Sequence, residues 1–86
     1  MELNPWIESV TGVEPPRKAS LATIRAAADV LGEKPRTVYA WYRRDRIPSF
    51  GAALNITIKS KGAVDWNGIF IPFARLAIEV GGESAA

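Results

Sequence analysis

The chain has 86 residues, of which 48% are hydrophobic and 23% charged, and it carries a net charge of +2 with no cysteine and no histidine. These values predict one globular domain near the lower size limit of independent folding, and they exclude disulfides, thiolate nucleophiles and imidazole chemistry. Because no apolar run approaches the roughly 18 residues of a membrane span and the N-terminus lacks signal-peptide character, we expect a cytoplasmic protein.

Positive charge is concentrated in the middle of the chain. Residues 17–61 hold ten of the eleven Lys and Arg but only three of the nine acids, a formal charge of +7, whereas the remaining residues sum to −5. A basic segment of this kind favours a polyanionic partner. A solvated charged surface without such a partner is the alternative.

The first predicted helix begins at Asn4-Pro5, because an Asn side chain caps free amides and proline fits the first helical position. It should end at Thr11-Gly12, and the prolines within residues 13–18 then predict a loop. Its inward side chains should be Trp6, Ile7 and Val10.

Two helices are predicted over residues 21–31 and 35–45. Ser20 caps the first helix, Gly32 supplies the turn, and Pro35 opens the second, which should end at about Arg44 or Asp45. Ala28 has to be small so that the second helix can cross closely over the first. The apolar residues expected on the inner faces of this pair are Leu21, Ile24, Ala28, Leu31, Val38 and Trp41.

A fourth helix is predicted from the Ser49 cap to Gly62, although the β-type propensity of residues 55–58 makes a strand the local alternative. Asp65 then begins a short turn over residues 66–70. Pro72 starts a last helix with Phe73, Leu76, Ala77 and Val80 on one face, which should stop at Gly81-Gly82. We therefore expect an all-α fold, a compact bundle of about five helices, in one domain over residues 1–80 with a flexible tail at 81–86.

The segment from Ile24 to Pro48 holds several marked positions at a characteristic spacing, namely Ala28, Gly32, Val38, Trp41, Arg44 and Ile47-Pro48. This spacing resembles the helix-turn-helix of small phage and prophage regulators, the Cro-like and YdaS-like proteins and, more distantly, the lambda CII activator. The resemblance covers about residues 20–50 and implies a lambda repressor/Cro-like fold, in which the first motif helix braces the DNA backbone and the second reads the major groove. The motif core would be Ala28, Leu31, Gly32, Val38 and Trp41.

On this interpretation, the exposed face of residues 34–43 reads base edges. The candidates are Lys34, Arg36, Tyr39 and Arg43, since arginine pairs with guanine and a tyrosine ring packs on a thymine methyl group. Phosphate contacts fix the register without reading sequence, and their candidates are Arg25, Thr37, Arg44, Arg46, Arg17 and Lys18. Trp41, three residues after Val38, is predicted to be in the core; the alternative is a platform that stacks on bases.

The sequence therefore predicts a sequence-specific regulator of phage or prophage origin that binds double-stranded DNA as a homodimer on an inverted repeat, because one recognition helix reads too few base pairs. Apolar residues after Pro48 must supply both core and dimer interface, namely Phe50, Leu54, Ile58, Trp66, Ile69, Phe70, Phe73 and Leu76. We expect no enzyme, cofactor, metal or small-molecule substrate, since no paired carboxylates, ligand spacing or phosphate loop occur. Two alternatives remain open: a DNA-packaging or recombination accessory protein (small terminase subunit or excisionase type), and a phage protein-interaction module.

Overall fold

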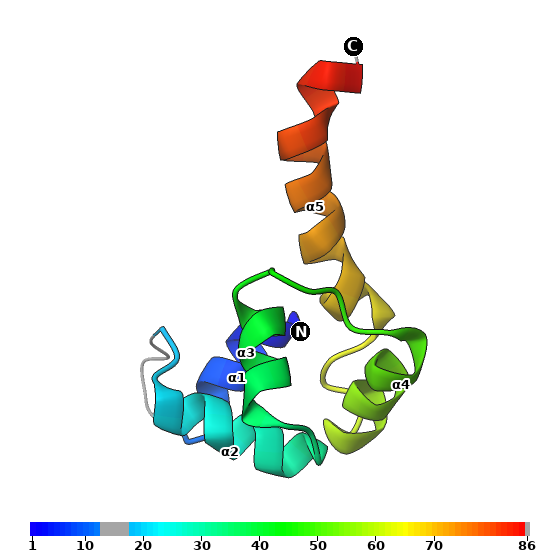
Figure 1. Cartoon of the computed structure of the whole chain (residues 1–86). Coiled ribbons are helices and arrows are strands. Elements are labelled where there is room, and N and C mark those ends of the chain that lie inside the picture. The colour runs from blue at the N-terminus through cyan, green and yellow to red at the C-terminus, as the bar shows by residue number, and fades with distance from the viewer. Residues whose placement is uncertain (13–17, 86) are drawn as a thin grey trace.

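The computed structural model describes residues 1–12 and 18–85, and all the regular structure within them is helical (Figure 1). The helices are α1 (Leu3–Ser9), α2 (Leu21–Leu31), α3 (Pro35–Tyr42), α4 (Phe50–Lys59) and α5 (Trp66–Ala85). The prediction of an all-α fold with about five helices is confirmed. None of the helices in the described ranges combines the length and the apolar character that crossing a bilayer requires.

A single hydrophobic core joins all five helices. α2 lies at its centre, because it packs against α1, α3 and α4, while α4 packs in turn against α5. The buried members of the core are Leu3, Ile7, Ile24, Ala27, Ala28, Leu31, Val38, Trp41, Ala53, Ile56, Val64 and Ile69, with Trp6 and Val10 partly buried against them. Burial of this apolar surface is the main stabilising contribution available to a chain without disulfides.

Local sequence signals determine where α2 begins and ends and where α3 begins. Ser20 Oγ accepts a hydrogen bond of 3.2 Å from the N–H of Thr23 and so caps α2. Gly32 follows α2 in the left-handed conformation with φ of +67°, where a side chain would be unfavourable. Pro35 is the first residue of α3. The predicted roles of Ser20, Gly32 and Pro35 are confirmed.

Two details of this pair differ from the prediction. Leu21 is 61% exposed, and Ala27, which is fully buried, contacts the core instead. α3 ends at Tyr42, two or three residues earlier than expected. The chain leaves the helix there because Arg44 adopts the left-handed conformation, with φ of +66°.

α1 begins one residue before its expected cap. The residue before the helix is Glu2, whose side chain makes no capping hydrogen bond. Asn4 lies inside the helix, where its Nδ2 donates to the carbonyl oxygen of Tyr42 (2.9 Å) and its Oδ1 accepts from Arg44 Nη1 (3.1 Å). The prediction of Asn4 as a cap is therefore wrong, because the amide bonds to the end of α3 instead of to its own helix.

α4 forms as a helix, and not as the alternative strand. Ser49 Oγ accepts a hydrogen bond of 3.2 Å from the N–H of Ala52, which confirms the predicted cap. The helix ends at Lys59, slightly before the predicted stop at Gly62, which lies in the following turn with φ of +81°. The turn also places Lys61 in the left-handed conformation, with φ of +56°.

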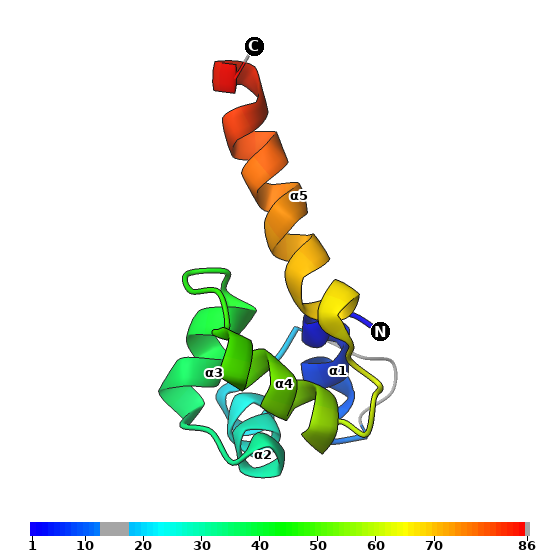
Figure 2. The same cartoon turned by 90° about the vertical axis from the view of Figure 1, so that its right-hand side faces the viewer.

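α5 is one continuous helix where the sequence predicted a turn followed by a helix from Pro72. Asp65 starts it early, because its Oδ1 accepts from the N–H of Gly68 (2.8 Å) and its carbonyl oxygen accepts from the N–H of Ile69 (3.0 Å). Pro72 therefore lies inside the helix. The helix also continues through Gly81-Gly82 to Ala85, since glycine weakens a helix without removing a backbone donor. Its C-terminal half extends away from the other four helices (Figures 1 and 2).

Candidate nucleic-acid interface

The outer face of α3 presents the residues predicted to read bases. Arg36, Tyr39 and Arg43 are all exposed on or directly after this helix, and Lys34 is exposed at its N-cap. Their opposite face is anchored, since Val38 is fully buried. α3 is thus a short helix held on α2 by apolar contacts, with basic and aromatic side chains facing solvent.

Arg43 is pre-oriented by two neighbours. Its guanidinium lies over the ring of Tyr39, 5.6 Å from the ring centroid, and its Nε is 3.7 Å from Asp45 Oδ2. Both members of the ion pair are more than half exposed, so the pair contributes little energy. Arg43 therefore keeps its accessible charge, while Tyr39 and Asp45 restrict the directions in which it points.

Apart from Arg44, the predicted phosphate contacts fall into three groups. Arg25, Arg46 and Lys18 are exposed, on α2, after α3 and before α2, respectively. Thr37 is half-buried on α3. Arg17 lies outside the described residues. The exposed members of this set, together with Lys34, Arg36, Arg43, Lys59 and Lys61, place most of the positive charge of the middle segment on the surface.

Arg44 has structural contacts that the sequence did not predict. Its guanidinium is half-buried, with Nη1 donating to Asn4 Oδ1 and the ring of Phe73 beneath it, 5.1 Å away at the centroid. Burial lowers the pKa of the Arg44 guanidinium; Glu2 opposes this shift and the charge of Arg75 adds to it. The phosphate contact of Arg44 stays a prediction; in this structure the side chain also joins α1 to α5, through Asn4 and Phe73.

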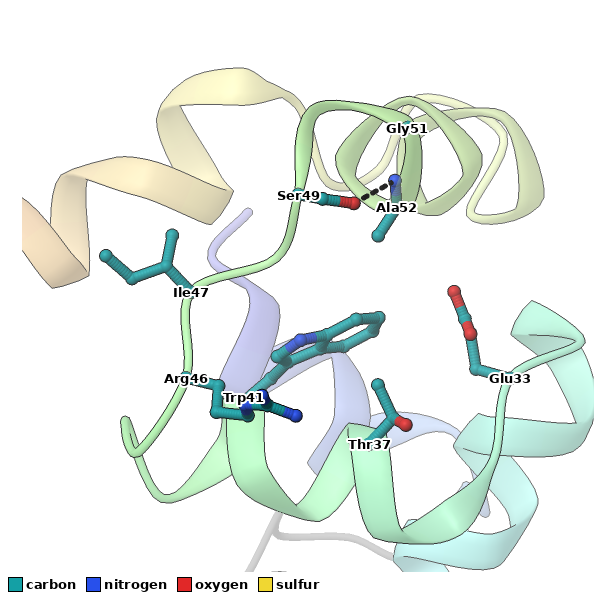
Figure 3. Close-up of a pocket in the computed structure, with 8 residues that line it drawn as sticks. All are labelled: Glu33, Thr37, Trp41, Arg46, Ile47, Ser49, Gly51 and Ala52. Atoms are coloured by element: carbon teal, nitrogen blue, oxygen red, sulfur yellow. Dashed lines mark hydrogen bonds between the residues drawn. The ribbon is translucent and has the colours of Figure 1, made fainter.

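A cleft of about 480 Å³ separates α3 from the start of α4 (Figure 3). Trp41 forms one wall, with the indole ring lying between Thr37 and the Ser49–Ala52 turn, while the Glu33 carboxylate points in from the α2–α3 connection. Trp41 is only 3% exposed, which confirms its predicted place in the core and leaves no ring face free to stack on bases. Glu33 and Ile47, which the sequence assigned to no site, also line this cleft.

The structure divides the interface candidates between core and surface. Ile69 is fully buried and Phe73 is 7% exposed, so both belong to the core and their assignment to an interface is wrong. Phe70 is half-buried. The exposed members are Phe50, Leu54, Ile58, Trp66 and Leu76. α4 turns the small Ala53 and the branched Ile56 inward, which leaves its aligned large residues outside.

The acids of the described segments form no metal-binding group of three or more ligands.

No signal in the sequence pointed to the hydrogen-bonded cluster around Tyr42. The Tyr42 hydroxyl donates to Glu8 Oε2 (2.6 Å) and accepts from the N–H of Ala19 (2.9 Å).

Comparison of the chain with protein-family models, with curated proteins and with solved structures gave no match.

Proposed function

We propose that the chain binds double-stranded DNA in a sequence-specific manner, with α2 and α3 acting as a helix-turn-helix and α3 entering the major groove. The observation that carries the proposal is the two-sided character of α3. Its inner face is fully buried at Val38, whereas Arg36, Tyr39 and Arg43 are exposed on the outer side. Arginine and tyrosine at helical spacing have the donors and the apolar ring that base edges in the major groove accept.

The surroundings of α3 support a polyanionic ligand. Arg25 on α2 and Arg46 after α3 are both exposed, and the basic segment of residues 17–61 contains most of the cations of the chain. Such a charge distribution steers a duplex to this side and supplies affinity that does not depend on sequence. The resemblance of residues 20–50 to phage and prophage regulators adds the proposed role, which is transcription regulation.

The experiment compares two arginines that have different roles in the proposal. A duplex selected by the protein from a random pool and an unrelated duplex are titrated, with binding followed by fluorescence anisotropy at several salt concentrations. Arg36→Ala should weaken binding to the selected duplex by about 1–3 kcal/mol, and the unrelated duplex much less. Arg46→Ala should weaken both duplexes equally and lower the salt slope by about one.

The outcomes separate the possible functions. If selection returns no preferred sequence and both variants weaken all duplexes alike, α3 does not read bases and the protein is an architectural DNA-binding protein. If no duplex binds at moderate salt, the proposal is refuted.

A further inference from the structure

A continuous apolar stripe crosses the outside of α4 and α5. Its large members are Phe50, Leu54, Ile58, Trp66 and Phe70, and we refer to it as the α4–α5 stripe. Phe50, Leu54 and Ile58 are four residues apart and therefore share one face of α4; they are 72%, 45% and 62% exposed. Phe50 contacts Trp66 with ring centroids 5.1 Å apart, and Trp66 stacks on Phe70 at 5.5 Å, which joins the two helices into one surface.

The exposed part of the stripe is comparable to the largest apolar patch on a typical monomer. An aromatic side chain has about 150–250 Å² of surface, and the members are only partly exposed, so the exposed part amounts to several hundred Å². Patches of this size are often functional. The rings are also held in place by one another, so little side-chain entropy remains to be lost when they are covered.

The charge of the stripe indicates what covers it. No charged residue occurs from Ile47 to Ile58 or from Trp66 to Ala74. Within these spans the stripe offers no charge to a polyanion or to a charged protein surface, in contrast to α3; exposed charges follow at its edge, at Lys59, Lys61 and Asp65. In a two-fold interface each residue near the axis meets its own copy, so any charge would face a like charge. An uncharged apolar stripe avoids this repulsion and is suited to a second copy of the chain.

The position of the stripe relative to α3 fits a pair of copies as well. Figure 2 looks onto α4, with α3 at the left edge, and Figure 1 shows α4 at the right of the molecule, apart from α3. The two helices thus occupy neighbouring sides of the protein and not opposite ones. A two-fold axis beside α4 can therefore turn both copies of α3 to the same side, where one duplex would contact both.

We infer that the α4–α5 stripe is the interface of a homodimer in which Phe50 and Ile58 of each copy are covered by the other. The dimer follows from the stripe alone. Only its consequence for DNA, two α3 helices on one duplex, rests on the proposed function.

The test measures the oligomeric state of the full chain without DNA, by sedimentation equilibrium at micromolar concentrations. Ile58→Lys on the stripe is compared with Leu21→Lys on α2, because the two side chains are equally exposed, at 62% and 61%. Since a two-fold interface carries each substitution twice, we expect Ile58→Lys to raise the dissociation constant at least about a hundredfold. Leu21→Lys should leave the dimer unchanged, and both variants should keep the wild-type circular dichroism.

A wild-type chain that sediments as a monomer throughout this range, or an Ile58→Lys variant that remains dimeric, would overturn the inference. The two proposals fail separately. If the chain is a dimer but does not bind duplex DNA, only the proposed function is refuted. If the chain is a monomer but binds one DNA sequence in preference to others, only the dimer is refuted. Salt gives a second distinction, because the uncharged interface should be nearly insensitive to salt while DNA binding is not.

Discussion

The hydroxyl of Tyr42 and the carboxylate of Glu8 are joined by a hydrogen bond of 2.6 Å, which ties the last residue of α3 to α1. The same hydroxyl accepts from the backbone N–H of Ala19, just before α2. One side chain thus connects three segments that are far apart in the sequence. Because α3 is only eight residues long, this connection at its end complements the apolar anchor formed by Val38 and Trp41.

Replacing Tyr42 by Phe tests this connection. The variant keeps the ring but removes the acceptor for Ala19 and the donor to Glu8, so we expect the free energy of unfolding to fall by about 1–2 kcal/mol. Urea denaturation followed by circular dichroism at neutral pH measures the change. Tyr39→Phe is the matched control, because Tyr39 is exposed on the outer face of α3 and should cost less than about 0.5 kcal/mol. Equal losses in the two variants would contradict the structural role of Tyr42.

Tyr42 also predicts how stability changes at alkaline pH. Burial and, after it, the hydrogen bond to Glu8 raise the pKa of Tyr42, while the N–H of Ala19 acts in the opposite direction. The folded state therefore holds a proton that the unfolded chain releases near pH 10. The stabilisation by protonated Tyr42 is present in full below the pKa that Tyr42 has in the unfolded chain. It is lost as the pH rises through the pKa that Tyr42 has in the folded protein. Urea denaturation at rising pH should show this loss in the wild type, and Tyr42→Phe should show less of it.

Arg44 provides a prediction that separates a structural arginine from a DNA contact. Arg44→Ala removes the hydrogen bond to Asn4 and the contact with the Phe73 ring, which should lower the free energy of unfolding by about 1–2 kcal/mol. Arg46→Ala, at an exposed position, should change stability by less than about 0.5 kcal/mol. The salt slope of DNA binding should show the opposite pattern: it should fall by about one for Arg46→Ala and stay unchanged for Arg44→Ala. An Arg44→Ala variant that is as stable as the wild type but has a reduced salt slope would show that Arg44 contacts phosphate and has no structural role.

The parts of the fold that could be predicted from the sequence are those set by neighbouring residues. Ser20 and Ser49 cap helices through N–H groups three residues away, and Gly32 acts through its own φ. The amphipathic pattern of α3 likewise placed Val38 and Trp41 in the core. Each of these signals lies within one or two helical turns, so the local sequence contains all of it.

The errors arose where a partner is distant in the sequence. Asn4 resembles a cap, but its amide bonds to Tyr42 and Arg44, 38 and 40 residues further on. The division of the apolar residues after Pro48 depends on which face of α4 contacts α2, and both faces of that helix are apolar. Helical spacing shows that Phe50, Leu54 and Ile58 share a face, but only the packed structure shows that this face is the outer one.

Gly68 and Gly51 form a last pair for which the packing predicts opposite effects of the same substitution. A Cβ on Gly68 would collide with the carbonyl oxygen of Met1 and come within 3.3 Å of Glu2 Cα, so backbone atoms would have to move. Because Leu3, the next residue, is fully buried, that movement would disturb the core, and we expect Gly68→Ala to lower the free energy of unfolding by about 1–3 kcal/mol. A Cβ on Gly51 would meet nothing within 4 Å, so Gly51→Ala should raise the free energy of unfolding by about 0.5–1 kcal/mol through better helix propensity. Urea denaturation of both variants decides the matter: if Gly68→Ala is as stable as Gly51→Ala, the first two residues do not pack against α5 in solution.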